Sequence, residues 1–220
     1  MELINNVFIK KFFRVVLIFT LFVVVIMGLS ACTKNQDKEV QTSSKKEPYT
    51  IVKKDDISLD KIKRYVYTVV INSEAKKSEL EKIANEIIEK AKSEGAFNGI
   101  QILMYDGEYA ALGDEPPSLG KYTYAPEGDF AKAMDINAGD YSNMKSLNEL
   151  KEANWKLRPS EDTQKIISMY NELFKKESEK NSEGIINEED IRNKTAELMG
   201  ISVQDVDDAL VKLDEWIWHE

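Results

Sequence analysis

The chain has 220 residues, of which 42% are hydrophobic and 31% charged, and its formal net charge is −9. This composition is that of a globular protein and excludes collagen, a coiled coil and a wholly disordered chain. The acidic balance argues against a nucleic acid or an anionic lipid surface as partner, because phosphates demand a basic face. A lone cysteine excludes an intrachain disulfide, and a lone histidine, His219, excludes Cys/His metal sites and most histidine-based catalysis. We assign no catalytic residue, no metal ligand and no cofactor from the sequence.

The N-terminus has the order of charged and apolar residues that an export signal requires. Lys10, Lys11 and Arg14 precede a mostly apolar run over residues 15–29. We therefore predict a signal peptide over residues 1–31.

The apolar run ends in Leu29-Ser30-Ala31-Cys32, which resembles the lipobox of bacterial lipoproteins. Small residues let an extended backbone enter a narrow peptidase cleft, and the thiol accepts a diacylglyceryl group before cleavage. The resemblance implies a lipid-modified Cys32, with palmitate-type acyl chains, at the extracytoplasmic face of a cell membrane. Two acyl chains suffice for stable attachment. Two alternatives stay open: an uncleaved transmembrane helix, which needs about 20 apolar residues, and an ordinary secretory signal that leaves Cys32 free.

Residues 32–60 are mostly polar, and their scattered apolar positions follow neither a helical nor a strand period. We therefore predict a flexible tether over this range.

A folded domain is predicted over residues 61–176. The β-branched and aromatic run Tyr65–Ile71 indicates a strand. Ser78 and Glu81 have the spacing of a capping box at the start of an amphipathic helix, and Gly95 ends it. A second buried strand is expected over Asn98–Tyr105, and Asp106-Gly107 after it predicts a hairpin. The expected fold class is α+β: a small mixed or antiparallel sheet with a helix packed on one face.

Residues 106–141 are rich in glycine and proline, which indicates turns between short strands. The candidate strands are Tyr122–Tyr124 and Phe130–Ile136, and beyond Ser146 the chain looks helical.

A helical C-terminal extension is predicted over residues 177–220. The preceding domain ends in a helix that begins at Pro159-Ser160, and charged residues 175–184 form a hinge after it. The extension itself consists of two helices, over Glu188–Met199 and Val203–Trp218. Whether these last helices pack on the sheet domain stays open at this point. Trp216 and Trp218 are two apart, so on a helix only one of them can dock.

The central region, Tyr65 to about Phe174, resembles an uncharacterised family of small bacterial lipoproteins recorded only as a domain of unknown function. The segments that carry the resemblance are Tyr65–Ile71, Gly99-Ile100-Gln101-Ile102, Tyr124–Phe130 and Gly139-Asp140-Tyr141. It implies a fold and a lipid-anchored location, and it implies no activity.

The segment Ala196–Val206 resembles a helix-turn-helix, in which the second helix enters a DNA major groove. That second helix is acidic, however, and phosphate contacts need cations. We therefore predict a packed helical pair that binds no nucleic acid, with caps at Asn187, Gly200 and Ser202.

Acidic residues give two further candidate sites. Asp135-Ile136-Asn137-Ala138-Gly139-Asp140 has the alternating oxygen ligands of a calcium loop, but Leu147 stands where the bidentate glutamate belongs. The pairs Asp106/Glu108 and Asp114/Glu115 could divide general acid and base work, although carboxylates beside turn residues are exposed by default.

Tyr122, Tyr124, Phe130 and Tyr141 fall among the turns and could line a shallow groove for a peptide or glycan, although packing in the core is the commoner role of such residues. The function predicted from these observations is a membrane-anchored binding module of the cell envelope. Its partner is expected to be an envelope protein, a wall polymer or a small ligand. The alternative is an envelope hydrolase that uses paired carboxylates, among them Asp129.

Overall fold

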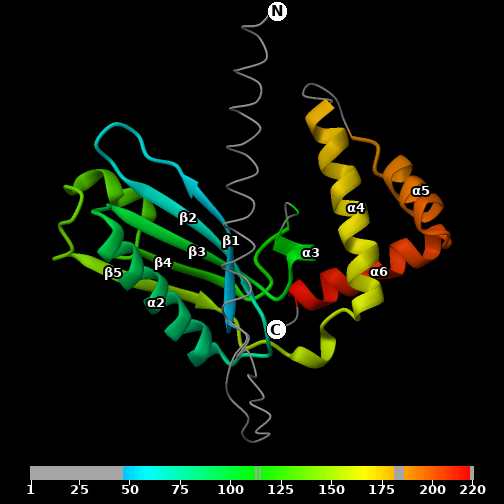
Figure 1. Ribbon diagram of the computed structural model, residues 1–220, viewed down its shortest axis with the longest axis horizontal. Coiled ribbons are helices and arrows are strands. Elements are labelled where there is room, and N and C mark those ends of the chain that lie inside the picture. Colours follow the sequence, from blue (N-terminus) through cyan, green and yellow to red (C-terminus); the bar gives the residue numbers. More distant parts are fainter. Residues whose placement is uncertain (1–46, 112, 114, 181–185, 219–220) are drawn as a thin grey trace, which may run out of the picture. The chain divides into compact units, whose positions relative to one another are not determined.

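A five-stranded mixed sheet organises the part of the chain that the computed structural model describes, which is residues 47–111, 113, 115–180 and 186–218 (Figure 1). The strands lie side by side in chain order: β1 Tyr49–Asp56, β2 Arg64–Ile71, β3 Gly99–Tyr105, β4 Gly120–Pro126 and β5 Met144–Leu150. β2 and β3 are parallel, and the other neighbours are antiparallel. The expected α+β class with a mixed sheet is confirmed. The predicted signal peptide and Cys32 lie outside the described residues.

β1 corrects the expectation of a flexible tether over residues 32–60, because Tyr49–Asp56 pairs along β2. Tyr49 and Ile51 pack against the core, but the register shifts between Ile51 and Lys53. This β-bulge breaks the alternation of apolar and polar residues, which is the signal by which a strand is found in a sequence.

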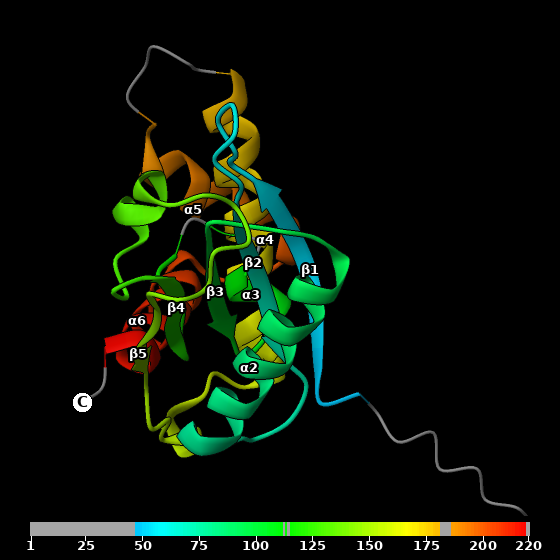
Figure 2. The same cartoon turned by 90° about the vertical axis from the view of Figure 1, so that its left-hand side faces the viewer.

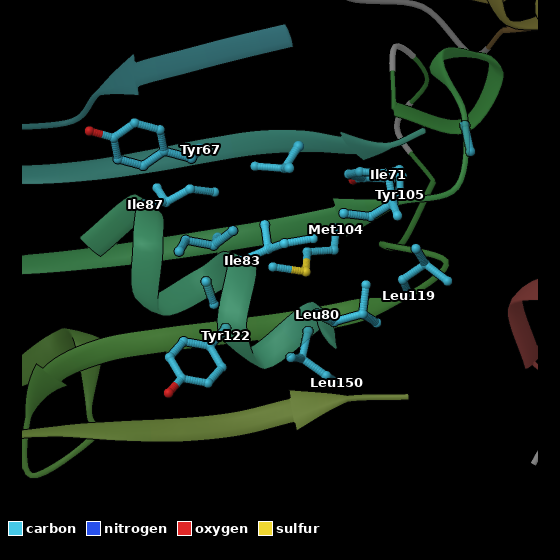
Figure 3. Close-up of a cluster of buried hydrophobic side chains, with 14 of the residues drawn as sticks. Tyr67, Ile71, Leu80, Ile83, Ile87, Met104, Tyr105, Leu119, Tyr122 and Leu150 are labelled. Carbon is cyan, nitrogen blue, oxygen red and sulfur yellow. The ribbon is translucent and has the colours of Figure 1, made fainter. Parts of the chain in front are cut away.

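Helix α2, Lys77–Glu94, connects the parallel strands β2 and β3 and covers one face of the sheet (Figures 1 and 2). Its apolar stripe is buried as the sequence predicts, and the buried residues are Leu80, Ile83, Ala84, Ile87, Ile88 and Ala91. Figure 3 shows Leu80, Ile83 and Ile87 against side chains of the strands. The helix begins earlier than expected: Lys76 is the N-cap, and its N–H donates to the Glu79 carboxylate at 2.8 Å. Gly95 ends the helix as expected.

The hairpin predicted at Asp106-Gly107 is wrong. β4 does pair antiparallel with β3, but the short helix α3, Glu108–Ala111, and a loop lie between the two strands. The Gly107 carbonyl accepts from Ala110 and Ala111 and so starts this helix. The Asp106 side chain is buried, unlike that of an exposed turn residue.

Two further elements differ from the expectation. Phe130–Asp135 forms the 3-10 helix η1 in place of a strand, with Asp129 accepting from Ala131 N at 2.9 Å. Beyond Ser146 the chain continues in β5 and a short 3-10 helix, η2 Trp155–Leu157, before any long helix begins. Most side chains of β5 are exposed, so the strand carries little of the apolar alternation that would reveal it.

Three helices close the described chain: α4 Glu161–Lys180, α5 Glu188–Met199 and α6 Val203–Trp218. The bounds predicted for α5 and α6 are confirmed. Asn187 caps α5, Gly200 ends it with a positive φ of 67°, and Ser202 caps α6 through Asp205 N. α4 runs on through Lys180, so the first part of the expected hinge is helical, whereas residues 181–185 lie outside the description.

The C-terminal helices share the core of the sheet. Ile167, Leu213, Trp216 and Ile217 belong to the same buried cluster as the residues between α2 and the strands. Figure 1 shows the three helices grouped at one end of the sheet, and in Figure 2 they lie behind the strands. A second cluster lies among the helices themselves and contains Tyr170, Leu173, Ile191, Ala196 and Val206. The boundary expected between residues 176 and 177 therefore falls inside α4.

Of the two C-terminal tryptophans, Trp216 is fully buried and Trp218 is 66% exposed. The expectation that only one of them docks is confirmed.

Candidate functional site

The four aromatic residues predicted to line one groove lie on two different faces of the sheet. Tyr122 is buried under α2, and its hydroxyl donates to Asn85 Oδ1 at 3.3 Å. Tyr124 and Tyr141 lie on the same face, with ring centroids 6.5 Å apart and Phe97 packed against both. These three tyrosines therefore serve the packing of α2 on the sheet.

Lys92 of α2 covers the pair Tyr124 and Tyr141. Its Nζ lies 4.8 Å from the Tyr124 ring centroid and 5.4 Å from that of Tyr141, and it donates to Glu89 at 2.7 Å. Partial burial opposes the charge, but Glu89 and Tyr124 outweigh it, so the pKa of Lys92 is raised. An ammonium group of the chain itself already occupies this aromatic surface.

Phe130 lies on the far face, which we define as the side of the sheet opposite α2. A Cβ at Gly99 would lie 3.1 Å from its ring, and the Arg64 guanidinium is 5.7 Å from its centroid. Ile100 is buried under α2. Because neighbouring side chains of a strand point to opposite faces of the sheet, the position of Gly99 faces away from α2. Phe130 is thus separated from the three tyrosines by the sheet.

Among the described carboxylates of the predicted acidic pairs, Asp106 is the most enclosed, at 1% exposed. Four side chains donate to it: Tyr109 Oη at 2.7 Å, Ser118 Oγ at 2.7 Å, Arg158 Nε at 2.7 Å and Trp216 Nε1 at 2.9 Å. Arg158 Nη2 also donates to the Asp106 carbonyl at 2.7 Å. We call this set the Asp106 junction, and it joins the end of β3 to α3, to the loops before β4 and α4, and to α6.

The junction leaves Asp106 no role at a substrate, because both carboxylate oxygens already accept two hydrogen bonds each. Burial, and then the neighbouring Asp106 carboxylate, raise the pKa of Tyr109, which holds its hydroxyl protonated as a donor. Glu108 is exposed, and Asp129 caps η1. Asp114 lies outside the described residues.

The stretch proposed as a calcium loop forms a turn. Asp140 Oδ1 accepts from the Ser142 hydroxyl at 2.7 Å and from Ser142 N at 3.1 Å. In the described part of the chain, no group of three or more acidic, histidine or cysteine side chains lies close enough together to hold a metal ion.

A groove opens on the far face between the sheet and α4, with a cavity volume of about 370 Å³. Val66 and Leu103 form its floor with Tyr105, and Phe174 of α4 forms its wall. Thr68 and Asn171 add polar groups, and Asn171 Nδ2 is held by the Tyr109 carbonyl at 3.0 Å. The volume lies within the range of small-molecule sites.

The rim of this groove carries charge from two distant segments. Lys53 and Asp55 of β1 form an ion pair of 3.0 Å, and Lys175 of α4 is exposed. Since the ion pair is neutral overall, Lys175 gives the rim a net positive charge in an acidic protein. An apolar floor beneath a cationic rim fits a ligand with an apolar body and an anionic group.

No family model, curated protein or solved structure matches this chain. The resemblances to the lipobox and to the small-lipoprotein family therefore stay predictions.

Among the described helices, none is long and apolar enough to cross a membrane.

Sequence reasoning missed the groove for two physical reasons. Lys53 and Asp55 fall in the range expected to be a tether, and Phe174 and Lys175 come from a helix far along the chain. The signal that could have found part of it is the alternation in β2 and β3, where Val66, Thr68 and Leu103 face away from the side that α2 covers.

Proposed function

We propose that this chain is a lipid-anchored protein of the bacterial cell envelope that acts by binding. The anchor rests on the export signal and on Cys32, the chain's one cysteine, at the position that the lipobox requires. Two acyl chains on this residue hold a protein stably at a membrane.

The far-face groove is the binding surface in this proposal, and its occupant is a small molecule or peptide end with an apolar body and an anionic group. The observation that carries it is the 370 Å³ groove, whose apolar floor lies beneath Lys53 and Lys175. This surface replaces the one expected around Tyr122, Tyr124, Phe130 and Tyr141. Those four residues cannot line one groove, because the sheet separates Phe130 from the three tyrosines.

The alternative of a hydrolase with paired carboxylates finds no support in the geometry. Asp106, which is buried, is already bound by four donors of the chain itself. A general acid or base must reach the proton that it transfers.

Metabolic labelling with palmitate tests the anchor. We expect label in the wild-type chain and none in Cys32→Ala, because the thiol is the acceptor of the diacylglyceryl group. Equal labelling of the two chains contradicts the anchor.

Methyl NMR of the full chain in lipid nanodiscs tests the groove, with octanoate and octylammonium as probes that share one apolar body. We expect octanoate to shift the Val66 and Leu103 methyl signals at millimolar concentration and octylammonium to shift them less. Lys175→Met should remove the preference for the carboxylate. Lys176→Met is the matched control, since Lys176 lies next to it in α4 and pairs with Glu172. Unchanged groove methyl signals contradict the groove as a binding site.

A further inference from the structure

The two edges of the sheet differ in how they are protected against pairing with another strand. β1 contains a bulge and four consecutive charged residues, Lys53 to Asp56. Both features discourage the addition of a further strand. β5 pairs with β4 in an unbroken register over seven residues and contains no proline. β5 is therefore the edge on which a further strand can add.

The hydrogen-bond pattern shows which groups of β5 point outward. Lys151 N donates to the Leu119 carbonyl at 3.0 Å and Glu127 N to the Asn143 carbonyl at 2.9 Å. In an antiparallel pair the groups alternate, so the odd-numbered residues of β5 face β4 and the even-numbered ones face away. Met144 N and Leu150 N already donate to Tyr141 and Asn148. The outward backbone groups of Ser146 and Asn148 have no partner in the described chain.

The side chains of β5 complement a second copy of the same strand. We propose that two copies of this chain associate through β5, antiparallel, about a two-fold axis at Leu147. Ser146 then exchanges backbone hydrogen bonds with Asn148 of the second copy. Lys145 lies opposite Glu149 of the second copy, twice by symmetry. Opposite charges directly across an antiparallel pair stabilise it.

The alternation of hydrogen-bonding groups excludes most other registers. An axis at Ser146 places Lys145 opposite a leucine, and an axis at Asn148 places Lys145 opposite Lys151 of the second copy. Only the axis at Leu147 pairs both charges and brings the two leucines together. Leu147 is 47% exposed, so contact with its own copy removes apolar surface from water.

Lys145 has no ion pair in the described chain, whereas Glu149 pairs with Lys121 at 3.0 Å. In the dimer, Glu149 lies between Lys121 of its own chain and Lys145 of the second copy. The association makes one continuous sheet with both far-face grooves open on the same side. It does not depend on what the grooves bind.

Disulfide crosslinking of the full chain in producing cells tests the register. Residues opposite each other in a non-hydrogen-bonded pair have Cα atoms about 4.5 Å apart, which is within the range of a disulfide. We expect Leu147→Cys to form a covalent dimer on mild oxidation. The wild type, whose one cysteine is Cys32, measures the background.

Lys145→Cys and Glu149→Cys are the matched controls for register. In the dimer, each of these positions lies about 13 Å from the same position of the second copy, because the two are offset by four residues along the strands. Neither should crosslink alone, and the two should crosslink when produced together. A Leu147→Cys chain that dimerises no more than the wild type overturns the proposal, and so does self-crosslinking of Lys145→Cys at an equal level.

Sedimentation of the purified full chain tests the charge pairs without a covalent bond. Lys145→Glu and Glu149→Lys should each weaken association about tenfold, because like charges replace two attractive pairs. A mixture of the two variants restores it, since the introduced glutamate of one variant meets the introduced lysine of the other only across the mixed interface. Lys61→Glu, at an exposed position between β1 and β2, should leave the association unchanged. A monomer at every concentration, or a dimer that ignores both variants, overturns the proposal.

Discussion

The two buried clusters of this protein are held together in different ways. The larger cluster, between α2, the sheet and α6, includes the Asp106 junction, where five segments meet at one carboxylate. The smaller cluster among α4, α5 and α6 is apolar, and an ion pair of 3.2 Å between Arg192 and Asp207 joins α5 to α6 outside it. The difference teaches that the sheet and the last helix are joined by a buried polar contact, whereas the core between the three helices is formed by less specific apolar packing.

The largest effect is expected from Asp106→Ala. It takes away the carboxylate that accepts from Tyr109, Ser118 and Trp216, and it removes the ion pair of Arg158 while leaving that residue's hydrogen bond to the backbone carbonyl. We expect a loss of about 3–5 kcal/mol in the free energy of unfolding, measured by urea denaturation. Glu108→Ala, two residues away and exposed, is the control and should change it by less than about 0.5 kcal/mol. Similar losses in both variants contradict a special role of the junction.

Ile191→Ala probes the smaller cluster. Removing a buried isoleucine side chain should cost about 2–4 kcal/mol, most of it local to the helices. Hydrogen exchange should show faster exchange in α5 while the amides of β2 and β3 stay protected. Leu198→Ala in the same helix is the control, because Leu198 is largely exposed. Equal loss of protection in the strands would show that the two clusters unfold as one.

The two tryptophans of α6 separate the polar contact from general apolar burial. Trp216→Phe keeps an aromatic ring but loses the hydrogen bond to Asp106, at a cost of about 1–3 kcal/mol. Trp218→Phe, at an exposed position, should have almost no effect. Thermal unfolding of the two variants measures the difference, and equal melting temperatures argue against the hydrogen bond.

The smallest effect is in the dependence of stability on pH. Because burial raises the pKa of Tyr109, the folded chain holds this proton more tightly than the unfolded chain does. The contribution is complete below about pH 10 and is lost above it, by about 1.4 kcal/mol per pH unit. Urea midpoints between pH 9 and 11 should fall less steeply in Tyr109→Phe than in the wild type. Burial, and then Glu86, raise the pKa of Tyr49 to about 12. Tyr49 contributes equally to the wild type and to Tyr109→Phe, so it does not affect their difference.

The sequence predicts best where the signals are local. The caps at Asn187, Gly200 and Ser202 lie within a few residues of the helices they bound, so α5 and α6 are found with their correct ends. The apolar stripe of α2 is found for the same reason.

The sequence predicts poorly where the residues in contact are far apart along the chain or where a strand lies at the edge of the sheet. Asp106 and Trp216 are 110 residues apart, and no local pattern indicates that the carboxylate is buried. β1 is hidden by its bulge, and β5 by its exposed side chains. The groove combines residues of β1 and α4, so its parts can be recognised only after the chain has folded.

The hydrogen bond from Trp216 to Asp106 also has a consequence for how the protein is made. The sheet contributes its residues early in synthesis, but Leu213, Trp216 and Ile217 complete its core only after α6 has left the ribosome. The nascent chain therefore stays incompletely folded through most of translation, which is compatible with the export that we propose. Chains truncated before α6 should remain sensitive to proteases, however complete their strands are.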